Sequence, residues 1–264
     1  MLHILQREFL QGEGDARTIR TVPLVANRGL ITDRNGEPLA VSTPVKSLWV
    51  DPSEIAGNGF AIRQLALELE LNPEVLGRNI AKNSGREFLY VKRRLPPADA
   101  DRILALDIEG VHVQQEYQRF YPQGEVAAHL IGFSNVDDVG QEGLELAFED
   151  WLRGVPGRRQ VMQDRRGRII EELNIIQTAR AGKRLELSID FRLQNLAYRE
   201  LKAEFITRRA KSATVVVLDV ATGEVLAMAN QPSYNPHNKV NMTDFSVLRN
   251  RAITDVFEPG STIK

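Results

Sequence analysis

Residues 257–264 read FEPGSTIK, and this stretch decides how the rest of the chain is interpreted. It places the hydroxyl of Ser261 and the amine of Lys264 three residues apart, after a Pro-Gly turn. If a helix begins at Ser261, both side chains lie on one helical face, about one turn apart. A neutral lysine can then accept the serine proton, and the unpaired N–H groups of a helix start can stabilise an oxyanion. The spacing makes Ser261 a candidate nucleophile and Lys264 its candidate base.

The Ser-x-x-Lys spacing is weak evidence when it stands alone. It fixes only two common residue types, so about one match is expected by chance in a chain of this length. A helix-capping serine followed by a solvated lysine explains the same letters. The sequence before residue 257 must therefore decide between the two interpretations.

The composition is that of an ordinary mixed protein, and it excludes several kinds of site. The chain has 264 residues, 42% hydrophobic and 26% charged, with a formal net charge of −1 and no cysteine. The absence of cysteine excludes disulfides, a cysteine nucleophile and thiolate metal ligands. The four histidines do not cluster at metal-ligand spacing, and no phosphate loop or dinucleotide fingerprint appears. We therefore expect no metal, no cofactor and no nucleic-acid partner, and the near-neutral charge agrees with the last point.

The first part of the chain predicts an α+β arrangement of short strands and helices. Asn35-Gly36 between apolar stretches predicts a hairpin with a type I′ turn. A strand is expected at 18–26, and its proline suggests that it lies at the edge of a sheet. The elements expected after the hairpin are a strand at 45–50, helices at 60–71 and 74–83, a strand at 87–93, a helix at 97–106, a strand at 111–117, and hairpins over 158–189.

Several charged residues in this first part are candidates for chemistry, and each also has a structural interpretation. Arg28, Asp33 and Arg34 are expected to form an ion-pair cluster that braces the hairpin, and a role in capping backbone N–H groups is favoured for Asp33 over a catalytic one. His129 stands in an apolar run, which favours a buried, hydrogen-bonded histidine over a catalytic base. Glu142 and Glu145 share a helix face, and a solvated first helical turn explains them better than acid-base work does.

The polar stretch at residues 177–183 is the clearest boundary in the chain. After it, a strand at 184–188 leads to Asp190, which is expected to cap a helix over 191–208. A buried strand at 214–218, a turn at 219–223 and a second strand at 224–229 should form an antiparallel hairpin against this helix. The residues expected on the inward face of the helix are Leu193, Leu196, Ala197, Leu201 and Phe205.

The order of these features resembles the class B penicillin-binding proteins, and the resemblance covers nearly the whole chain. Within that class the chain is most similar to the division-specific, septal D,D-transpeptidases of Gram-negative bacteria, the penicillin-binding protein three group. The matching residues form these motifs: Arg28-Gly29-x-Ile31-x-Asp33-Arg34-x-Gly36, Ala128-His129-x-x-Gly132, Gly140-x-Glu142-Gly143-x-Glu145, Asp219-x-x-Thr222-Gly223, Pro232-x-Tyr234-Asn235-Pro236, Asn250-Arg251-Ala252 and Phe257-Glu258-Pro259-Gly260-Ser261-Thr262-x-Lys264.

The resemblance implies a two-part fold. Residues 1–178 would form an elongated, non-catalytic pedestal domain that serves dimerisation or partner binding. Residues 179–264 would be the beginning of a penicillin-binding, β-lactamase-like transpeptidase domain, truncated at Lys264. A single membrane helix is expected before Met1, outside this chain, with the protein on the periplasmic face of the inner membrane.

The resemblance also implies an enzyme that cross-links peptidoglycan stem peptides through a serine acyl-enzyme. Ser261 would attack the penultimate D-alanine carbonyl, Lys264 would activate it, and β-lactams would acylate the same serine. The implied partners are stem peptides of lipid-linked nascent glycan, β-lactams, and a septal glycosyltransferase and other division proteins bound through the pedestal. Three alternatives stay open: an elongation-specific transpeptidase, a β-lactam sensor, or a non-catalytic interaction module of the division machinery.

The chain departs from the family pattern after the nucleophile. The family's Ser-x-Asn and Lys-Thr-Gly motifs follow the nucleophile, whereas this sequence stops at Lys264. Ser233-Tyr234-Asn235 fits the first pattern by letter, but it precedes Ser261 and falls in the Pro-Tyr-Asn-Pro loop. We therefore expect these 264 residues to be inactive without the rest of the transpeptidase domain.

Overall fold

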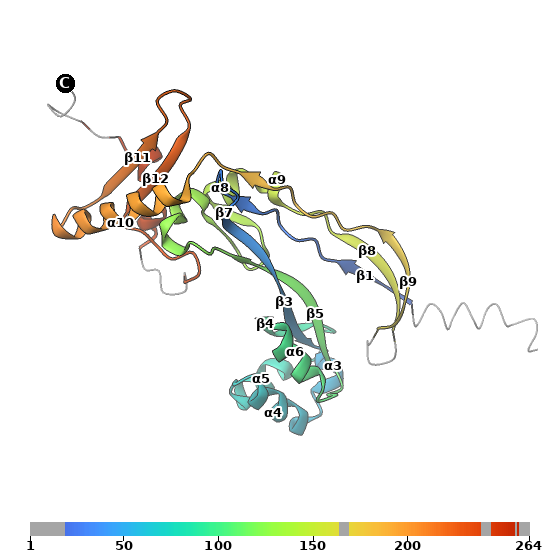
Figure 1. Ribbon diagram of the computed structural model, residues 1–264. Coiled ribbons are helices and arrows are strands. Elements are labelled where there is room, and N and C mark those ends of the chain that lie inside the picture. Colours follow the sequence, from blue (N-terminus) through green and yellow to red (C-terminus); the bar gives the residue numbers. More distant parts are fainter. Residues whose placement is uncertain (1–18, 164–168, 239–243, 257, 259–264) are drawn as a thin grey trace, which may run out of the picture. The chain divides into compact units, whose positions relative to one another are not determined.

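The computed structural model describes residues 19–163, 169–238, 244–256 and 258. The described residues form two compact units, whose elements are labelled in Figure 1: unit 1 comprises residues 19–26, 43–118, 155–163 and 169–180, and unit 2 comprises residues 27–42, 119–154, 181–238, 244–256 and 258. The mixed order of strands and helices confirms the predicted α+β fold class. As far as the chain is described, it contains no helix with the length and apolarity needed to cross a lipid bilayer.

One part of unit 1 is a three-stranded antiparallel sheet, ordered β1-β8-β9. Its strands are β1 (Ile19–Leu24), β8 (Gly157–Gln163) and β9 (Ile169–Gln177). Strand β1 lies at one edge, as its Pro23 predicts, because proline cannot donate to a second neighbouring strand. Strands β8 and β9 confirm the hairpin expected after residue 158, with Val161 opposite Glu172. Every residue of β9, the other edge strand, is exposed.

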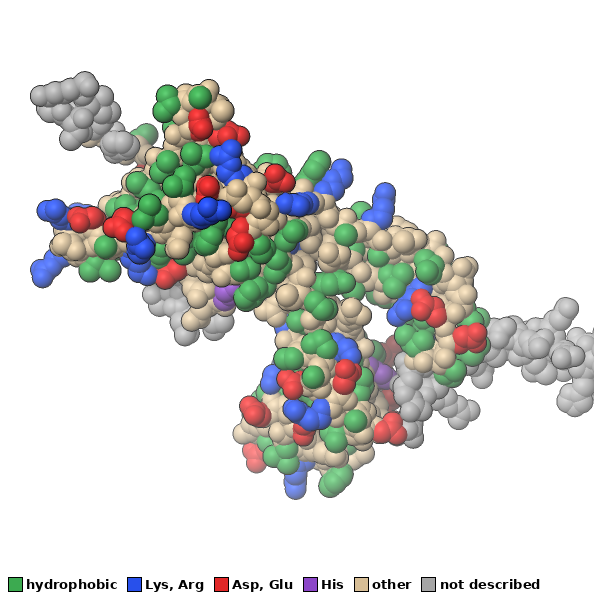
Figure 2. Space-filling view, viewed as in Figure 1, with side chains coloured by type: hydrophobic (Ala, Val, Ile, Leu, Met, Phe, Trp, Pro, Cys, Tyr) green, Lys and Arg blue, Asp and Glu red, His purple; other side chains and the backbone are tan. Residues whose placement is uncertain are grey.

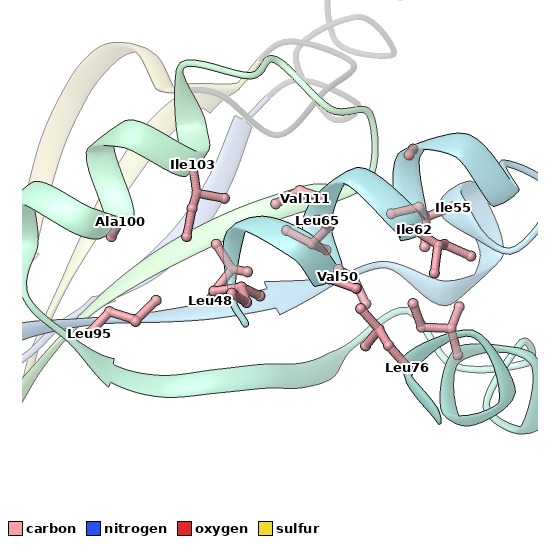
Figure 3. Packing of buried hydrophobic residues seen from close by; sticks show 14 residues of the cluster. Leu48, Val50, Ile55, Ile62, Leu65, Leu76, Leu95, Ala100, Ile103 and Val111 are labelled. Atoms are coloured by element: carbon pink, nitrogen blue, oxygen red, sulfur yellow. The ribbon is translucent and has the colours of Figure 1, made fainter. Parts of the chain in front are cut away.

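The other part of unit 1 packs helices against strands around one apolar core (Figure 3). Asn72 begins one helix by accepting hydrogen bonds from the N–H groups of Glu74 and Val75, and Pro73 follows at the first helical position. Leu48 and Val50 of β3 are completely buried beneath Leu65 and Ile80 of the helices. The elements are α3 (Pro52–Ile55), α4 (Gly59–Glu68), α5 (Pro73–Lys82), α6 (Pro97–Leu104), β4 (Leu89–Leu95) and parts of β3 (Pro38–Val50) and β5 (Val111–Phe120).

Unit 2 begins with the predicted hairpin, in which β2 (Ile31–Thr32) pairs antiparallel with β3. Strand β10 (Leu185–Glu186) pairs parallel with β2. The turn differs from the predicted type I′, because Gly36 has a φ of 87° whereas Asn35 is not among the described residues with positive φ. Short elements follow in this unit: η1 (Gly124–Val126), α7 (Ala128–Ile131), β6 (Phe133–Ser134), β7 (Gly140–Glu142), α8 (Gly143–Ala147) and α9 (Glu149–Leu152).

The backbone around residue 132 explains why a glycine ends the Ala-His-x-x-Gly motif. Its φ is 76°, and a Cβ atom placed there would lie 1.8 Å from the carbonyl oxygen of Glu142. Both the conformation and the space therefore require glycine. This close approach lets the chain after α7 pair with β7, where Phe133 lies opposite Glu142.

The last part of unit 2 is helix α10 (Phe191–Thr207) packed on the antiparallel hairpin of β11 (Ala213–Leu218) and β12 (Val225–Gln231). The Asp190 side chain accepts from the N–H of Arg192, as predicted for the cap. The hairpin turn is held by Asp219, which accepts from the N–H groups of Ala221 and Thr222. Lys/Arg and Asp/Glu side chains intermingle along the face of α10 seen in Figure 2.

Two expectations about this region were wrong. Leu193 and Leu196 are exposed, and Gln194 and Tyr198 are buried instead, because the α10 face that meets β12 is polar at its centre. Gln194 donates to the carbonyl oxygen of Met228 at 2.9 Å and accepts from the Met228 N–H at 2.7 Å. Strand β11 is also not fully buried, since its residues alternate between exposed and half-buried positions. A single packed face explains that alternation.

Candidate active site

Ser261 and Lys264 lie outside the described residues. The segment that precedes them in the chain is described as far as residue 256. This approach segment, residues 244–256, contains η2 (Phe245–Leu248) and α11 (Arg251–Thr254). Asp244 begins η2 by accepting from the N–H of Ser246 at 2.8 Å. Asp255, six residues before Ser261, accepts from Arg249 and Arg251 at 2.5 and 3.0 Å. The approach segment thus has a defined structure that ends five residues before the candidate nucleophile in the sequence.

Asn230 of β12 fastens the approach segment to the hairpin. Its side-chain oxygen accepts from the N–H of Ala252 at 2.8 Å, and its amide nitrogen donates to Oδ1 of Asn250 at 2.9 Å. Asn230 is only 1% exposed. A buried amide that bonds through both of its polar ends fixes the orientation of its partner, because neither bond can be exchanged for water.

His129 of α7 fastens the same segment from a second side. Its Nε2 atom lies 2.8 Å from the carbonyl oxygen of Val247, and its ring packs edge-on against Tyr234 at 5.2 Å. The hydroxyl of Tyr234 in turn donates to the carbonyl oxygen of Ala128 at 2.9 Å. Burial lowers the pKa of His129, the hydrogen bond to the Val247 carbonyl opposes that shift, and the charge of Arg251 adds a smaller lowering; the net direction is downward, which favours the neutral imidazole. This confirms the prediction of a buried, hydrogen-bonded histidine.

The Pro-Tyr-Asn-Pro loop uses its polar side chains to hold the backbone. Ser233 donates through its hydroxyl to the carbonyl oxygen of Glu125 at 2.9 Å, and Asn235 accepts from the N–H of His237 at 2.9 Å. These contacts support the interpretation of Ser233-Tyr234-Asn235 as a structural loop.

A cluster of buried charges lies in unit 2, and we call Arg28, Arg119, Glu145 and Glu149 the buried charge cluster. Glu145 is completely buried, and its two carboxylate oxygens accept from Arg28 Nε at 2.5 Å and from Arg119 Nε at 2.6 Å. Arg28 also donates to the Glu145 carbonyl oxygen at 2.6 Å and pairs with Glu149 at 2.7 Å. A carboxylate between two guanidinium groups tolerates this burial because every charge has a partner of opposite sign.

The buried charge cluster corrects two predictions. Glu145 does not belong to a solvated helical turn, because the two arginines draw it into the interior. Arg28, Asp33 and Arg34 do not form one cluster either: Arg28 pairs with Glu145, and Arg34 pairs with Glu224 at 3.4 Å. No sequence signal pointed to Arg119, whose neighbours in the chain are polar and aromatic.

Two carboxyl groups of unit 2 have pKa values shifted in opposite directions. Burial raises the pKa of Asp138 to about 6, although the charges of Arg119 and Arg28 partly oppose that rise. Burial also acts against ionisation of Asp33, but hydrogen bonds from the N–H groups of Phe191, Glu37 and Asn35 outweigh it and hold the pKa of Asp33 below its ordinary value. The capping role predicted for Asp33 is therefore confirmed.

Unit 1 carries an apolar groove with a volume of about 690 Å³. Strands β1 and β5 supply much of its lining, together with Trp49 and Leu104. The ring of Trp49 is itself held between Phe88 and His112, with centroid distances of 4.7 and 4.3 Å. Apolar side chains make up most of the exposed surface of the groove, with His112 and Arg159 also in its lining. Among the described residues, no group of three or more His, Cys, Asp or Glu is arranged to hold a metal ion.

Comparison with known proteins places most of the chain in one family. Residues 23–187 match the family described as "Penicillin-binding Protein dimerisation domain", and residues 213–264 match the "Penicillin binding protein transpeptidase domain". The chain is 48% identical over 268 residues to "Peptidoglycan D,D-transpeptidase FtsI" of Escherichia coli K12. It is 44% identical over 263 residues to "Probable peptidoglycan D,D-transpeptidase PbpC" of Pseudomonas aeruginosa. Both alignments cover 100% of this chain and 45% and 46% of the relatives, so the chain spans about half their length.

Solved structures share the fold at lower identity. A peptidoglycan synthetase from Bifidobacterium adolescentis aligns over 92% of this chain and 48% of its own, with a TM-score of 0.58 and 23% identity. The complex between penicillin-binding protein PBP2 and MreC from Helicobacter pylori aligns over 86% of this chain and 45% of its own, with a TM-score of 0.63 and 22% identity. The chain belongs to the penicillin-binding proteins, with their dimerisation domain followed by the beginning of their transpeptidase domain.

Proposed function

We propose that the full-length protein is the peptidoglycan D,D-transpeptidase of the division septum. The observation that carries this proposal is the 48% identity to Escherichia coli FtsI along the whole chain, together with a transpeptidase match that extends through Ser261 and Lys264. The proposal places the enzyme on the periplasmic face of the inner membrane, where it acts on the stem peptides of nascent, lipid-linked glycan.

The proposed reaction is acyl transfer through Ser261. Lys264 accepts the hydroxyl proton as the Ser261 oxygen attacks the penultimate D-alanine carbonyl. The peptide bond breaks, and the terminal D-alanine leaves as an amine that carries a proton. An amine from a neighbouring stem then attacks the ester, forms the cross-link and restores the serine. The Ser261 N–H contributes to the oxyanion hole. No cofactor takes part in these steps.

Labelling with a fluorescent penicillin tests the proposal. The full-length protein should bind the label covalently, the Ser261→Ala variant should not, and Ser233→Ala should bind it as the wild type does. Persistent labelling of Ser261→Ala would exclude Ser261 as the nucleophile. Depletion in cells separates the septal role from an elongation role, since filaments indicate division and round cells indicate elongation. A β-lactam sensor would bind the label, and its depletion would change neither the division nor the shape of the cells.

Residues 1–178 are proposed as the non-catalytic domain and residues 179–264 as the opening of the transpeptidase domain. The stretch between the two family matches, residues 188–212, lies close to this boundary. As a second function, residues 1–178 would dock a septal glycosyltransferase or other division proteins. The exposed isoleucines of β9 and the apolar groove of unit 1 favour this role, and the Helicobacter pylori relative was solved in complex with MreC.

A membrane pull-down tests the docking role. Ile170 of β9 is 64% exposed, so Ile170→Lys should reduce the recovery of division proteins with the full-length protein. Leu146→Lys, at a residue of α8 that is 52% exposed, serves as the control. Equal recovery with both variants would count against docking through β9.

A further inference from the structure

The apolar groove of unit 1 borders the edges of two strands. Its lining includes residues 111–115 of β5 without a gap, and residues 22–25 in and directly after β1. Successive side chains of a strand point to opposite faces, so a groove on one face is lined by every second residue. A run of consecutive lining residues means instead that the groove lies beside the strand, where its N–H and C=O groups point. The groove therefore follows the backbone edges of β1 and β5.

On the groove side, neither strand has a neighbouring strand within the described parts of the chain. Strand β1 pairs with β8 alone, and β5 pairs with β3 alone. One edge of each strand is thus occupied, and the open edge is the one that follows the groove. An open edge presents N–H and C=O groups that can pair with an added strand.

The two edges differ in what they can bind. Pro23 of β1 has no N–H, and a proline on an edge strand hinders the addition of another strand. Strand β5 reads VHVQQEYQRF, without proline or glycine, so each of its residues keeps its N–H donor. We therefore assign strand pairing to the edge of β5, and the role of an apolar wall to β1.

The lining determines which side chains an occupant can carry. Leu24, Trp49 and Leu104 supply apolar surface from three different elements, and Leu104 at the end of α6 is 42% exposed. Arg159 is the only Lys or Arg residue in the lining, which contains no Asp or Glu. A basic side chain of the occupant would lose hydration beside a like charge, whereas an acidic one would be attracted. The lining thus selects apolar and acidic side chains.

We infer that the open edge of β5 is a strand-addition site. It binds an extended segment of a partner protein that carries apolar side chains at alternate positions, with an acidic residue and no basic one. The inference rests on the docking function proposed above and names the form that the docked segment takes. Main-chain hydrogen bonds provide the affinity in such a site, and contacts of alternate side chains provide the specificity. Residues 111–117 span about 20 Å at about 3.3 Å per residue, so a partner segment of about six residues matches this edge.

The test measures the binding of a labelled peptide to the full-length protein. The probe is acetyl-Thr-Val-Glu-Val-Thr-Val-amide with a fluorophore, and fluorescence anisotropy gives its dissociation constant. Leu104→Lys puts a charge into the groove at a partly exposed position and should raise the dissociation constant about tenfold or more. Leu67→Lys is the matched control, at a residue of α4 that is 67% exposed and does not line the groove. It should change the dissociation constant by less than about twofold.

Amide hydrogen exchange shows which strand the peptide joins. An added strand accepts from the N–H groups of β5, so exchange in residues 111–117 should slow when the peptide binds and exchange in β9 should not change. The same peptide with a methyl group on every amide nitrogen cannot donate, and it should not bind.

Three results would overturn the inference: no binding of the peptide to the wild type, equal dissociation constants for Leu104→Lys and the wild type, or slowed exchange only in strands other than β5. If Leu104→Lys does not fold, Leu104→Gln replaces it, because its uncharged polar side chain also removes apolar surface from the groove. A wild-type dissociation constant in that variant overturns the inference equally.

Penicillin labelling and the membrane pull-down, run on the same variants, separate this inference from the proposed functions. Leu104→Lys should be labelled as the wild type is, and a wild type without label contradicts the transpeptidase function, whatever the peptide does. If Ile170→Lys lowers the recovery of division proteins and Leu104→Lys does not, the docking function stands and the strand-addition site on β5 fails.

Discussion

Arg28 donates from Nε to the carboxylate of Glu145 at 2.5 Å, across 117 residues of sequence, and both side chains are buried. Arg119 holds the other oxygen of the same carboxylate. This pairing ties the start of unit 2 to helix α8. Arg28 and Glu145 belong to the motifs that resemble those of the penicillin-binding proteins. The structure gives these motifs a physical reason, because the buried carboxylate of Glu145 is shared by two guanidinium groups.

Glu145→Gln tests the stability that this pairing provides. The substitution keeps the side-chain volume but leaves two buried guanidinium groups facing a neutral amide. Breaking one partner of a buried pair costs about 3–5 kcal/mol, so the free energy of unfolding in urea should fall by about that amount. Glu142→Gln, three residues earlier on a half-buried side chain, should cost less than about 1 kcal/mol. Equal losses in the two variants would mean that the buried charges are not paired as described.

The raised pKa of Asp138 predicts that the free energy of unfolding depends on pH. Burial raises its pKa in the folded protein to about 6, above its ordinary value of 3.8, so the folded state binds this proton more tightly than the unfolded state does. The contribution of Asp138 to stability is therefore present at low pH and is lost as the pH rises through about 6. Asp138→Asn does not titrate, so its stability relative to the wild type should increase between about pH 4 and pH 7. Urea unfolding across that range measures this difference, and a constant or falling difference would contradict the burial of this carboxyl.

Gly132→Ala tests the close approach of α7 to β7. The added methyl group would lie 1.8 Å from the Glu142 carbonyl oxygen, at a φ of 76°, so the backbone must move. We expect a loss of more than about 3 kcal/mol in the free energy of unfolding. Gly124→Ala is the matched control, because φ is 50° there but nothing lies within 4 Å of the new atom. It should lose only about 1 kcal/mol, the cost of the left-handed conformation. Similar losses at the two sites would show that the close approach is absent.

Lys264→Arg tests the proposed base. Arginine keeps the positive charge but does not release its proton near neutral pH, so it cannot accept the proton of Ser261. General-base catalysis contributes about 10²–10⁴-fold, and acylation by penicillin should slow by a factor in that range. Lys211→Arg, at an exposed lysine of the same domain, should react normally. Acylation of Lys264→Arg at the wild-type rate would exclude Lys264 as the base.

The sequence predicted those parts of the fold that depend on neighbouring residues. Asn72-Pro73 begins a helix and Asp190 caps another because each side chain bonds to N–H groups two or three residues away. The Asp219 turn and the hairpin that it closes follow the same local logic. These features are predictable because their partners stand beside them in the chain.

The features that sequence reasoning missed depend on distant partners. Glu145 appeared solvated because neither Arg28 nor Arg119 is near it in sequence. Leu193 was predicted to be buried from the spacing of apolar residues. That spacing does not show that the Gln194 side chain forms hydrogen bonds with the backbone of Met228 and is buried instead. His129 was predicted to be buried and hydrogen-bonded, but its partner, the Val247 carbonyl, lies 118 residues away and carries no sequence signal.

Mapping the acylated residue tests the central claim most directly. Trypsin should cut after Arg251 and release a peptide that begins at Ala252, and Ser261 is the only serine among residues 252–264. After reaction of the full-length protein with penicillin, we predict that this peptide gains the mass of one penicillin and that fragmentation places it on Ser261. An adduct on any other residue, or an unmodified peptide beginning at Ala252 from fully labelled protein, would contradict the assignment of Ser261 as the nucleophile.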